Sequence, residues 1–409
     1  MNNTEGVYWR EVIDPGDRAS KMAKEICFQS HKNSNRVHIV PHQPGNFRGP
    51  VGFVWKKGLL NRMSNYHLGD SGAVTDWDLT ESVENDGAGG KPQFFTLLGE
   101  AEVFYNLGWE IIAMTADDFA RSGRLPVVID NEVNAKRITE KNFHLFEATM
   151  HGYSDALKKA RLVNITGETA IMKHSITAFC DFNDDSQLVL TWGASCIGLC
   201  DRNKLIDGSL IIPGLPIIGL HEEGYRCNGG TFFTNLILHK WGKNPQELCT
   251  NQNVRNFVRS LTVPSKSYAS FITNLIGWED SEPVDILGIA HITGGGIWGK
   301  FKEILPQGVG ARLDTMPNPP EVLHRAQLMS EGTPYRLSDW QAYGTLHGGC
   351  GMLLVCAPSS VGTILRQAGH QGIEASIVGK TISSETNEVL IKSRFLYESD
   401  KELSSERMH

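Results

Sequence analysis

Hydrophobic and polar residues alternate with two different spacings along the first half of the chain. A continuous apolar run at 125–129 is typical of a buried strand, and apolar runs also cover 100–107 and 109–114. Over 142–160 the apolar residues recur every three or four positions, as on one side of a helix. They are Phe143, Phe146, Met150, Tyr153 and Leu157. This succession of strand-like and helical segments predicts a β/α arrangement.

The second half begins with an expected strand at 194–200 and a turn at 201–203. Gly229 and Gly230 lead into Thr231, which we expect to cap a helix over 232–241, because threonine favours that position. Similar patterns predict further helices at 252–261 and 360–369 and strands at 351–357, 374–378 and 389–396.

An acid-rich segment at 181–187 separates the apolar runs 176–180 and 188–192, which indicates a hairpin or a domain junction. At 409 residues the chain is too long for one ordinary core. We therefore expect an N-terminal domain at 1–187, a C-terminal domain at 188–385, and a terminal strand with a charged tail at 386–409.

The composition, 40% hydrophobic and 21% charged, is that of a globular protein. A net charge of -7 argues against a nucleic-acid partner, because polyanions are bound by clustered Lys and Arg. Residues 1–6 lack the features of a secretory signal, and the longest apolar stretch, 210–220, is interrupted by Pro213 and Pro216. We expect a cytoplasmic protein that binds small molecules and neither nucleic acid nor a membrane.

Eight cysteines are scattered along the chain, with no CxxC pair and no histidine at zinc spacing. Cys196 and Cys200 lie closest together, but their surroundings are apolar. We predict reduced thiols throughout and core positions for these two.

Four glycine-rich segments lie between the predicted elements, at 86–91, 167–170, 228–231 and 291–296. Glycine lets backbone N–H groups approach an anion, so such segments can bind phosphate, although each taken singly is also consistent with a plain turn. The common nucleotide motifs are missing. A P-loop would need glycine in place of Asn85 and Ser or Thr in place of Pro92, and no GxGxxG follows a strand.

Acidic residues stand beside these segments: Asp86 and Glu168 within two of them, and Asp117 and Asp118 after the apolar run 111–114. Mg²⁺ binds carboxylates together with phosphate oxygens. Acids at strand ends near phosphate loops therefore predict a Mg-nucleotide site, with exposed turn acids as the alternative.

The same segments, in the same order, resemble the motifs of the aminoimidazole ribonucleotide synthetase (phosphoribosylformylglycinamidine cyclo-ligase) family. Residues 86–91 are similar to its DGVGTK loop, 113–118 to AMxxND and 166–172 to GGETAEM, while 290–296 reproduce AHITGGG. Other similar segments are 14–17, 204–209, 226–229, 264–268 and 348–355. Nearly the whole chain is covered.

The chain also departs from these motifs. Gly90 replaces a threonine, Asp117 an asparagine, Ile165-Thr166 stand where a glycine pair is usual, and Arg226-Cys227 replace His-Ser. The family's N-terminal glycine-rich loop is represented by Gly45, Gly49 and Gly52 around Phe47 and Phe53, and insertions occur near 61–84 and 176–187.

The resemblance implies an α+β fold of two α/β-type domains, with the N-terminal sheet pairing in a dimer barrel and a C-terminal mixed sheet with helices. It implies a homodimer that uses ATP and Mg to cyclise formylglycinamidine ribonucleotide to aminoimidazole ribonucleotide, in purine biosynthesis, by phosphorylating the amide oxygen. Catalytic roles would fall to Lys91, Asp118 and His291, and metal binding to Asp86, Asp117 and Asp118. ATP or substrate would be bound by Gly87, Gly89, Gly90, Glu168, Thr169, Arg226, Asn228, Gly229, Thr293, Gly294, Gly295 and Gly296.

Arg226 cannot act as a base, because arginine stays protonated, but it could bind phosphate in a bidentate manner. Two alternatives to the cyclo-ligase stay open. One is a paralogue that phosphorylates another small substrate, and the other is an inactive nucleotide-binding relative.

Overall fold

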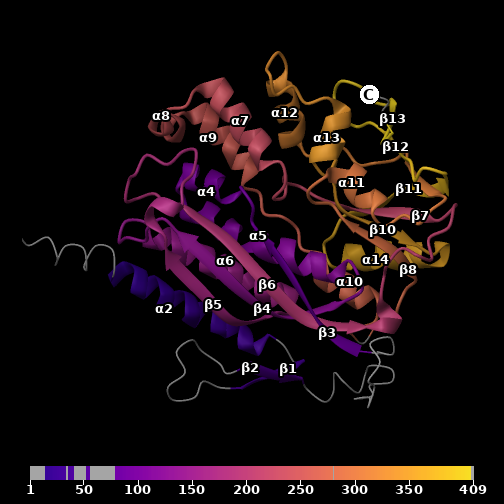
Figure 1. Ribbon diagram of the computed structural model, residues 1–409, viewed down its shortest axis with the longest axis horizontal. Helices are drawn as coiled ribbons and strands as arrows, with labels where there is room; N and C mark the ends of the chain where they lie inside the picture. Colours follow the sequence, from indigo (N-terminus) through magenta and orange to yellow (C-terminus); the bar gives the residue numbers. More distant parts are fainter. Residues whose placement is uncertain (1–13, 34–35, 41–51, 56–78, 280, 407–409) are drawn as a thin grey trace, which may run out of the picture. The chain divides into compact units, whose positions relative to one another are not determined.

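The chain folds into two compact units, each built on its own sheet (Figure 1). The computed structural model describes residues 14–33, 36–40, 52–55, 79–279 and 281–406. The first unit comprises Met1–Phe119, Arg124–Leu205 and Asn244–Thr262, and the second comprises Ala120–Gly123, Ile206–Lys243 and Val263–His409. The predicted combination of sheets and helices in both halves is confirmed.

The first unit contains a four-stranded sheet in the order β3-β6-β4-β5. Its strands are β3 (Leu79–Gly87), β6 (Leu190–Asp201), β4 (Leu125–Ala135) and β5 (Val163–Ile171). β6 is antiparallel to both β3 and β4, so β3 and β4 run in the same direction, and β4 and β5 are parallel. Along the second half of β4, buried residues alternate with the more exposed Asp130, Glu132 and Asn134, which leaves one polar face.

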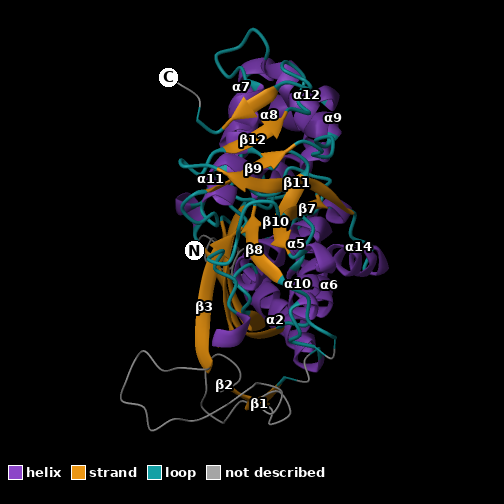
Figure 2. Ribbon diagram, turned by 90° about the vertical axis from the view of Figure 1, so that its right-hand side faces the viewer, coloured by secondary structure: helices purple, strands orange, loops and turns teal. Residues whose placement is uncertain are grey.

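Helices α4 (Pro92–Leu98), α5 (Ala101–Ala120) and α6 (Phe143–Ala160) follow strands of this sheet in the chain. Figure 2 shows α5 and α6 among the helices of the first unit. The predicted helix over 142–160 is confirmed. α5 and α6 approach closely, because a Cβ added to Gly152 would lie 1.9 Å from the carbonyl oxygen of Tyr105. The runs 100–107 and 109–114 do not include a strand, since a single helix covers both.

The N-terminal part of the first unit contributes α2 (Asp14–Phe28) and a small sheet of β1 (Val37–Val40) and β2 (Gly52–Trp55). The family-like segment 14–17 begins α2. The expectations for Gly45, Phe47 and Gly49 lie outside the described residues, as does most of the expected insertion at 61–84.

The second unit contains a seven-stranded sheet in the order β13-β12-β9-β11-β7-β10-β8. Its strands are β7 (Pro216–His221), β8 (Ile286–His291), β9 (Val309–Leu313), β10 (Cys350–Cys356), β11 (Ala375–Ser383), β12 (Val389–Lys392) and β13 (Glu402–Ser404). Only the pair of β12 and β9 is parallel, so the sheet is mixed, as expected. The strands predicted near 351–357, 374–378 and 389–396 are confirmed.

The helices of the second unit are α7 (Gly230–Trp241), α10 (Ala269–Leu275), α11 (Gly296–Lys302), α12 (Glu321–Ser330), α13 (Asp339–Thr345) and α14 (Val361–His370). The helices expected near 232–241 and 360–369 are thereby confirmed. The expected cap Thr231 is wrong, because α7 begins earlier, after the left-handed Gly229. In that conformation glycine meets no Cβ clash and can end the preceding loop.

Two segments after residue 187 belong to the first unit. β6 pairs with β3 and β4, and the helices α8 (Pro245–Thr250) and α9 (Gln252–Leu261), of which α9 was predicted, also lie in this unit. Cys196 and Cys200 are buried in β6, and all eight cysteines are free thiols. No helix in the described part of the chain is long and apolar enough to cross a membrane.

Candidate functional site

Two loops of the second unit meet at one edge of its sheet. β7 and β8 flank β10 and are both antiparallel to it, so they run in the same direction and end at the same edge. His221, at the end of β7, pairs with Cys350, and His291, at the end of β8, pairs with Met352. The segments that follow, 222–229 (loop A) and 292–295 (loop B), therefore start two residues apart along β10.

Loop A ends in residues that the sequence singled out. Arg226 has φ of 61° and Gly229 φ of 93°, and α7 starts directly afterwards. A left-handed backbone at a non-glycine residue is uncommon and costs energy, which the surroundings of Arg226 must compensate. The side chain of Asn228 is partly exposed, and its Oδ1 would lie 3.6 Å from a Cβ on Gly294 of loop B.

Loop B carries the other predicted residues. Thr293 is partly exposed, Gly294 and Gly295 are exposed, and Gly295 and Gly296 have φ of 92° and 58°. A Cβ on Gly296 would lie 2.2 Å from the carbonyl oxygen of Tyr343, so only glycine fits. The structure thus brings together His291, Arg226, Asn228, Gly229 and the glycines of loop B.

Beneath the two loops lies a buried charged cluster. Nη1 of Arg226 donates to Oε2 of Glu222 at 2.5 Å and to the carbonyl oxygen of Lys266 at 3.1 Å, and its Nη2 lies 2.7 Å from Nε2 of His291. Arg226 and His291 are each 1% exposed and Glu222 4%. Burial acts to raise the pKa of Glu222, but the guanidinium of Arg226 and the hydrogen bond from the Glu223 N–H contribute to holding this pKa below its usual value.

A glycine of β10 makes room for this cluster. A Cβ on Gly351 would lie 2.7 Å from Nη1 of Arg226 and 2.7 Å from the hydroxyl of Tyr268. The Tyr268 ring lies 5.6 Å from the guanidinium carbon of Arg226, and its hydroxyl donates to the carbonyl of His221. In this structure the guanidinium therefore binds protein groups, rather than presenting a bidentate surface to a phosphate.

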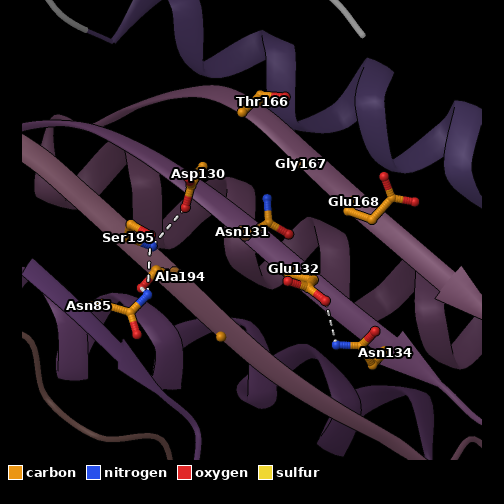
Figure 3. Close-up of a pocket in the computed structure, with 11 residues that line it drawn as sticks. Asn85, Asp130, Asn131, Glu132, Asn134, Thr166, Gly167, Glu168, Ala194 and Ser195 are labelled. Carbon is orange, nitrogen blue, oxygen red and sulfur yellow. Dashed lines mark hydrogen bonds between the residues drawn. The ribbon is translucent and has the colours of Figure 1, made fainter. Parts of the chain in front are cut away.

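The polar face of the first sheet contains a hollow of about 360 Å³ (Figure 3). Side chains from all four strands point toward it. Oδ1 of Asp130 accepts from the backbone N–H of Ser195, and Nδ2 of Asn85 donates to the hydroxyl of Ser195. The lining residues are Asn85, Asp130, Asn131, Glu132, Asn134, Thr166, Gly167, Glu168, Gly193, Ala194 and Ser195. Carboxylate and amide oxygens dominate, which suits a hard cation or a ligand rich in hydroxyl and amino groups.

A second hollow, of about 390 Å³, lies between α2 and β5 and shares Asn131, Gly167 and Glu168 with the first. Its walls include Lys24 of α2 and Asn164 of β5. Asn164 accepts through Oδ1 from Asn131 and from the hydroxyl of Tyr153, and burial raises the pKa of Tyr153 well above its usual value. Hydrogen bonds thus hold the side chains of Asn131 and Asn164 in place at this cavity. A cation, Lys24, and an acid, Glu168, line the same cavity.

Other predicted residues of the first unit are less clustered. Asp86 and Gly87 end β3, and Gly89 and Gly90 are exposed. Glu168 and Thr169 lie inside β5, not in a loop as expected, because their segment pairs along β4. Lys91 is fully buried, and its Nζ lies 2.7 Å from Oε1 of Glu110, which is equally buried.

Asp117 and Asp118 lie near the end of α5, not at a strand end. α5 leads to the start of β4, whereas Asp86 is near the end of β3, so the acids lie toward opposite ends of the sheet. Nowhere in the described residues do three or more His, Cys, Asp or Glu side chains gather into a group that could hold a metal ion. Metal binding by Asp86, Asp117 and Asp118 stays a prediction.

Sequence reasoning missed most of the polar lining of the two hollows, namely Lys24, Asn85, Asp130, Asn131, Glu132, Asn134, Asn164 and Ser195. One signal was present. The apolar run 125–129 continues into Asp-Asn-Glu-Val-Asn without Gly or Pro, which is consistent with a strand whose end becomes polar on one face.

Two consecutive domains of one family match the chain. The description "AIR synthase related protein, N-terminal domain" applies to residues 69–198, and "AIR synthase related protein, C-terminal domain" to residues 254–392. The phosphoribosylformylglycinamidine cyclo-ligase of Magnetococcus marinus is 26% identical over 331 residues, 79% of this chain and 86% of the relative. That of Thermococcus kodakarensis is 28% identical over 246 residues, 60% of this chain and 65%, just under two thirds, of the relative.

Solved structures share the fold at low identity. Thiamine-monophosphate kinase from Stenotrophomonas maltophilia superposes with a TM-score of 0.54 at 12% identity, covering 92% of this chain and 96% of that one. The hydrogenase maturation protein HypE of E. coli gives a TM-score of 0.53 at 14% identity, with 95% and 98% covered. The two-domain fold expected from the resemblance is confirmed.

Proposed function

Because this chain belongs to the AIR synthase related family, we propose that it is an ATP-dependent cyclo-ligase that converts formylglycinamidine ribonucleotide to aminoimidazole ribonucleotide in purine biosynthesis. The relatives named phosphoribosylformylglycinamidine cyclo-ligase support this reaction. The structural observation that carries the proposal is the meeting of loop A and loop B at one sheet edge, since both were expected to hold the substrate.

In the proposed reaction, ATP phosphorylates the amide oxygen of the substrate. The amidine nitrogen then attacks the activated carbon, and the oxygen leaves with the phosphoryl group as phosphate, which closes the imidazole ring. The protein has to position the reactants and neutralise their charge. Asn228, Gly229, Gly294 and Gly295 would hold the ribose phosphate, helped by the positive end of the α7 dipole.

The hollows of the first unit fit a nucleotide better than they fit a bare metal ion. Lys24 supplies a positive charge for phosphate groups, while Asp130, Glu132 and Glu168 supply oxygen ligands. Mg²⁺ at nucleotide sites takes one or two carboxylates together with phosphate oxygens, so it needs no cluster of three acids. When bound, the ion would neutralise phosphoryl charge. A HypE structure of the same fold, with a TM-score of 0.51 and 14% identity, was solved with ATP.

The dimer is also a proposal. We expect two copies to pair through the first sheet, whose edge strand β3 leaves Val83 63% exposed. Light scattering of the purified chain should then give twice the 45.2 kDa of one copy.

Coupled ADP release tests the reaction. We expect release that depends on both formylglycinamidine ribonucleotide and Mg²⁺. Glu168→Gln should raise KM for ATP without lowering Tm, whereas Glu303→Gln, which alters an exposed acid of the second unit, should change neither. Release at the same rate without the ribonucleotide would refute the cyclo-ligase.

A second candidate is a paralogue that phosphorylates another substrate. The buried Arg226 favours it, because arginine here replaces a histidine of the motif that the chain resembles. A panel of phosphorylated amides and amines in the same assay separates the two. Consumption of another member of the panel identifies the paralogue, and no release with any member indicates an inactive relative.

A further inference from the structure

The contact between Arg226 and His291 constrains where the imidazole carries its hydrogen. Nη2 of Arg226 lies 2.7 Å from Nε2 of His291, which is hydrogen-bond distance. A guanidinium has only donors and stays protonated in proteins. Nε2 of His291 must therefore accept, and an imidazole that accepts at Nε2 is neutral and carries its hydrogen on Nδ1.

The arginine is held firmly enough to impose this state. Its Nη1 is bound by Glu222 and by the carbonyl of Lys266, so the guanidinium cannot turn without breaking a buried ion pair. The left-handed backbone of Arg226 and the missing side chain of Gly351 both adapt the fold to this one placement. Strain that the surroundings maintain at one residue is commonly associated with function.

We propose that Arg226 is a positioning residue that fixes His291 as the neutral Nδ1–H tautomer. His291 then cannot take up a proton at Nε2, and it can donate a hydrogen bond from Nδ1 alone. For the reaction, and resting on the proposed function, this means that His291 does not act as a base through Nε2. The tautomer itself does not depend on which substrate is bound.

His347, a second buried histidine of the same unit, serves as a reference because its hydrogen bonds place the hydrogen on the other ring nitrogen. Nε2 of His347 lies 2.8 Å from the carbonyl oxygen of Gly224, and Nδ1 of His347 accepts from the backbone N–H of Gly349 at 3.1 Å. A carbonyl only accepts and a backbone N–H only donates, so His347 carries its hydrogen on Nε2. Two buried histidines of one unit should therefore show opposite tautomers.

Nuclear magnetic resonance of the full chain labelled with ¹⁵N-histidine tests this, because two-bond correlations distinguish the Nδ1–H form, the Nε2–H form and the imidazolium. Spectra of His291→Gln and His347→Gln assign the two rings by the signals that each variant loses. At neutral pH we expect Nδ1–H for His291 and Nε2–H for His347. An Nε2–H or imidazolium pattern at His291 in the wild type would overturn the proposal.

Variants separate the effect of the arginine from that of burial. Arg226→Gln should lose the single Nδ1–H state of His291 and leave His347 unchanged, whereas Arg259→Gln, which removes an exposed guanidinium of the first unit, should alter neither ring. If Arg226→Gln does not fold, the double variant Glu222→Gln/Arg226→Gln avoids an unpaired buried acid and is measured instead. An unchanged His291 pattern in the folded variant contradicts the role of Arg226. Failure of the ADP-release assay would refute the proposed function and leave this result intact.

Discussion

Replacing Lys91 by Met should destabilise the first unit strongly. Nζ of Lys91 and Oε1 of Glu110 are 2.7 Å apart, and neither side chain is exposed. Removing one partner of a buried ion pair deprives the other charge of that attraction in a medium of low dielectric constant, at a cost of about 3–5 kcal/mol. For a unit of this size, a loss of that order corresponds to a fall in Tm of roughly 6–20 °C.

Urea unfolding followed by tryptophan fluorescence measures this loss. The double variant Lys91→Met/Glu110→Leu should recover most of it, because an apolar pair can replace a buried ion pair at little cost. Lys300→Met is the control, since its partner Glu303 is exposed and such a pair contributes only about 0–1 kcal/mol.

The alternative is that Lys91 contacts phosphate, as the sequence suggested. Lys91→Met would then weaken ATP binding and leave the free energy of unfolding nearly unchanged. That result would refute the reasoning from burial.

Three further predictions follow from single contacts. Gly152→Ala should lower the free energy of unfolding by about 1–3 kcal/mol through overpacking, because the added Cβ would lie 1.9 Å from the Tyr105 carbonyl oxygen. Gly362→Ala in α14 is the control, since the space around its Cβ is open. In the same denaturant series it should be neutral or stabilising. Cys249 should be the first thiol alkylated by iodoacetamide, as measured by peptide mass spectrometry, because it alone is not buried and the neighbouring Cys180 lowers its pKa. A lowered pKa makes thiolate available at lower pH, so its alkylation rate should rise at a lower pH than that of a free cysteine, and equal labelling of the buried thiols would contradict this. Asp339→Ala should speed hydrogen exchange at the backbone N–H groups of Tyr397 and Glu398, because both donate hydrogen bonds to the Asp339 carboxylate. Exchange in α9 should stay unchanged.

The local spacing of apolar residues was sufficient to predict most of the helices and strands. The helices at 142–160 and 252–261 and the strand at 125–129 could be predicted because spacing and apolar content are properties of a short window. The expected strand end at Asp117 was wrong, because a short apolar run fits a buried helix as well as a strand, and only the full length of α5 distinguishes the two.

The domain boundary expected at residue 187 was inferred from the polar segment 181–187 alone. Which sheet a strand joins depends instead on the strands it pairs with, and these can be distant in the sequence. β6 follows that segment, yet it pairs with β3, about a hundred residues earlier. The polar lining of the hollows was missed for the same reason. Asn85, Asp130 and Ser195 stand in three separate strands, and only the strand order makes them neighbours.

The convergence of loops A and B shows what the glycine motifs in the sequence leave unexplained. Gly229 and Gly295 are visible in the sequence as residues that tolerate a left-handed backbone, and the structure gives both of them positive φ. What places the two loops together is β10, a strand that comes after both loops in the chain and lies between β7 and β8. Because both flanking strands are antiparallel to β10, their ends must share an edge, and because Gly351 has no side chain, the guanidinium of Arg226 can reach His291 beneath the loops. A bulkier residue at 351 should therefore separate Arg226 from His291 while both loops persist, which makes β10 the element through which the state of His291 can be altered.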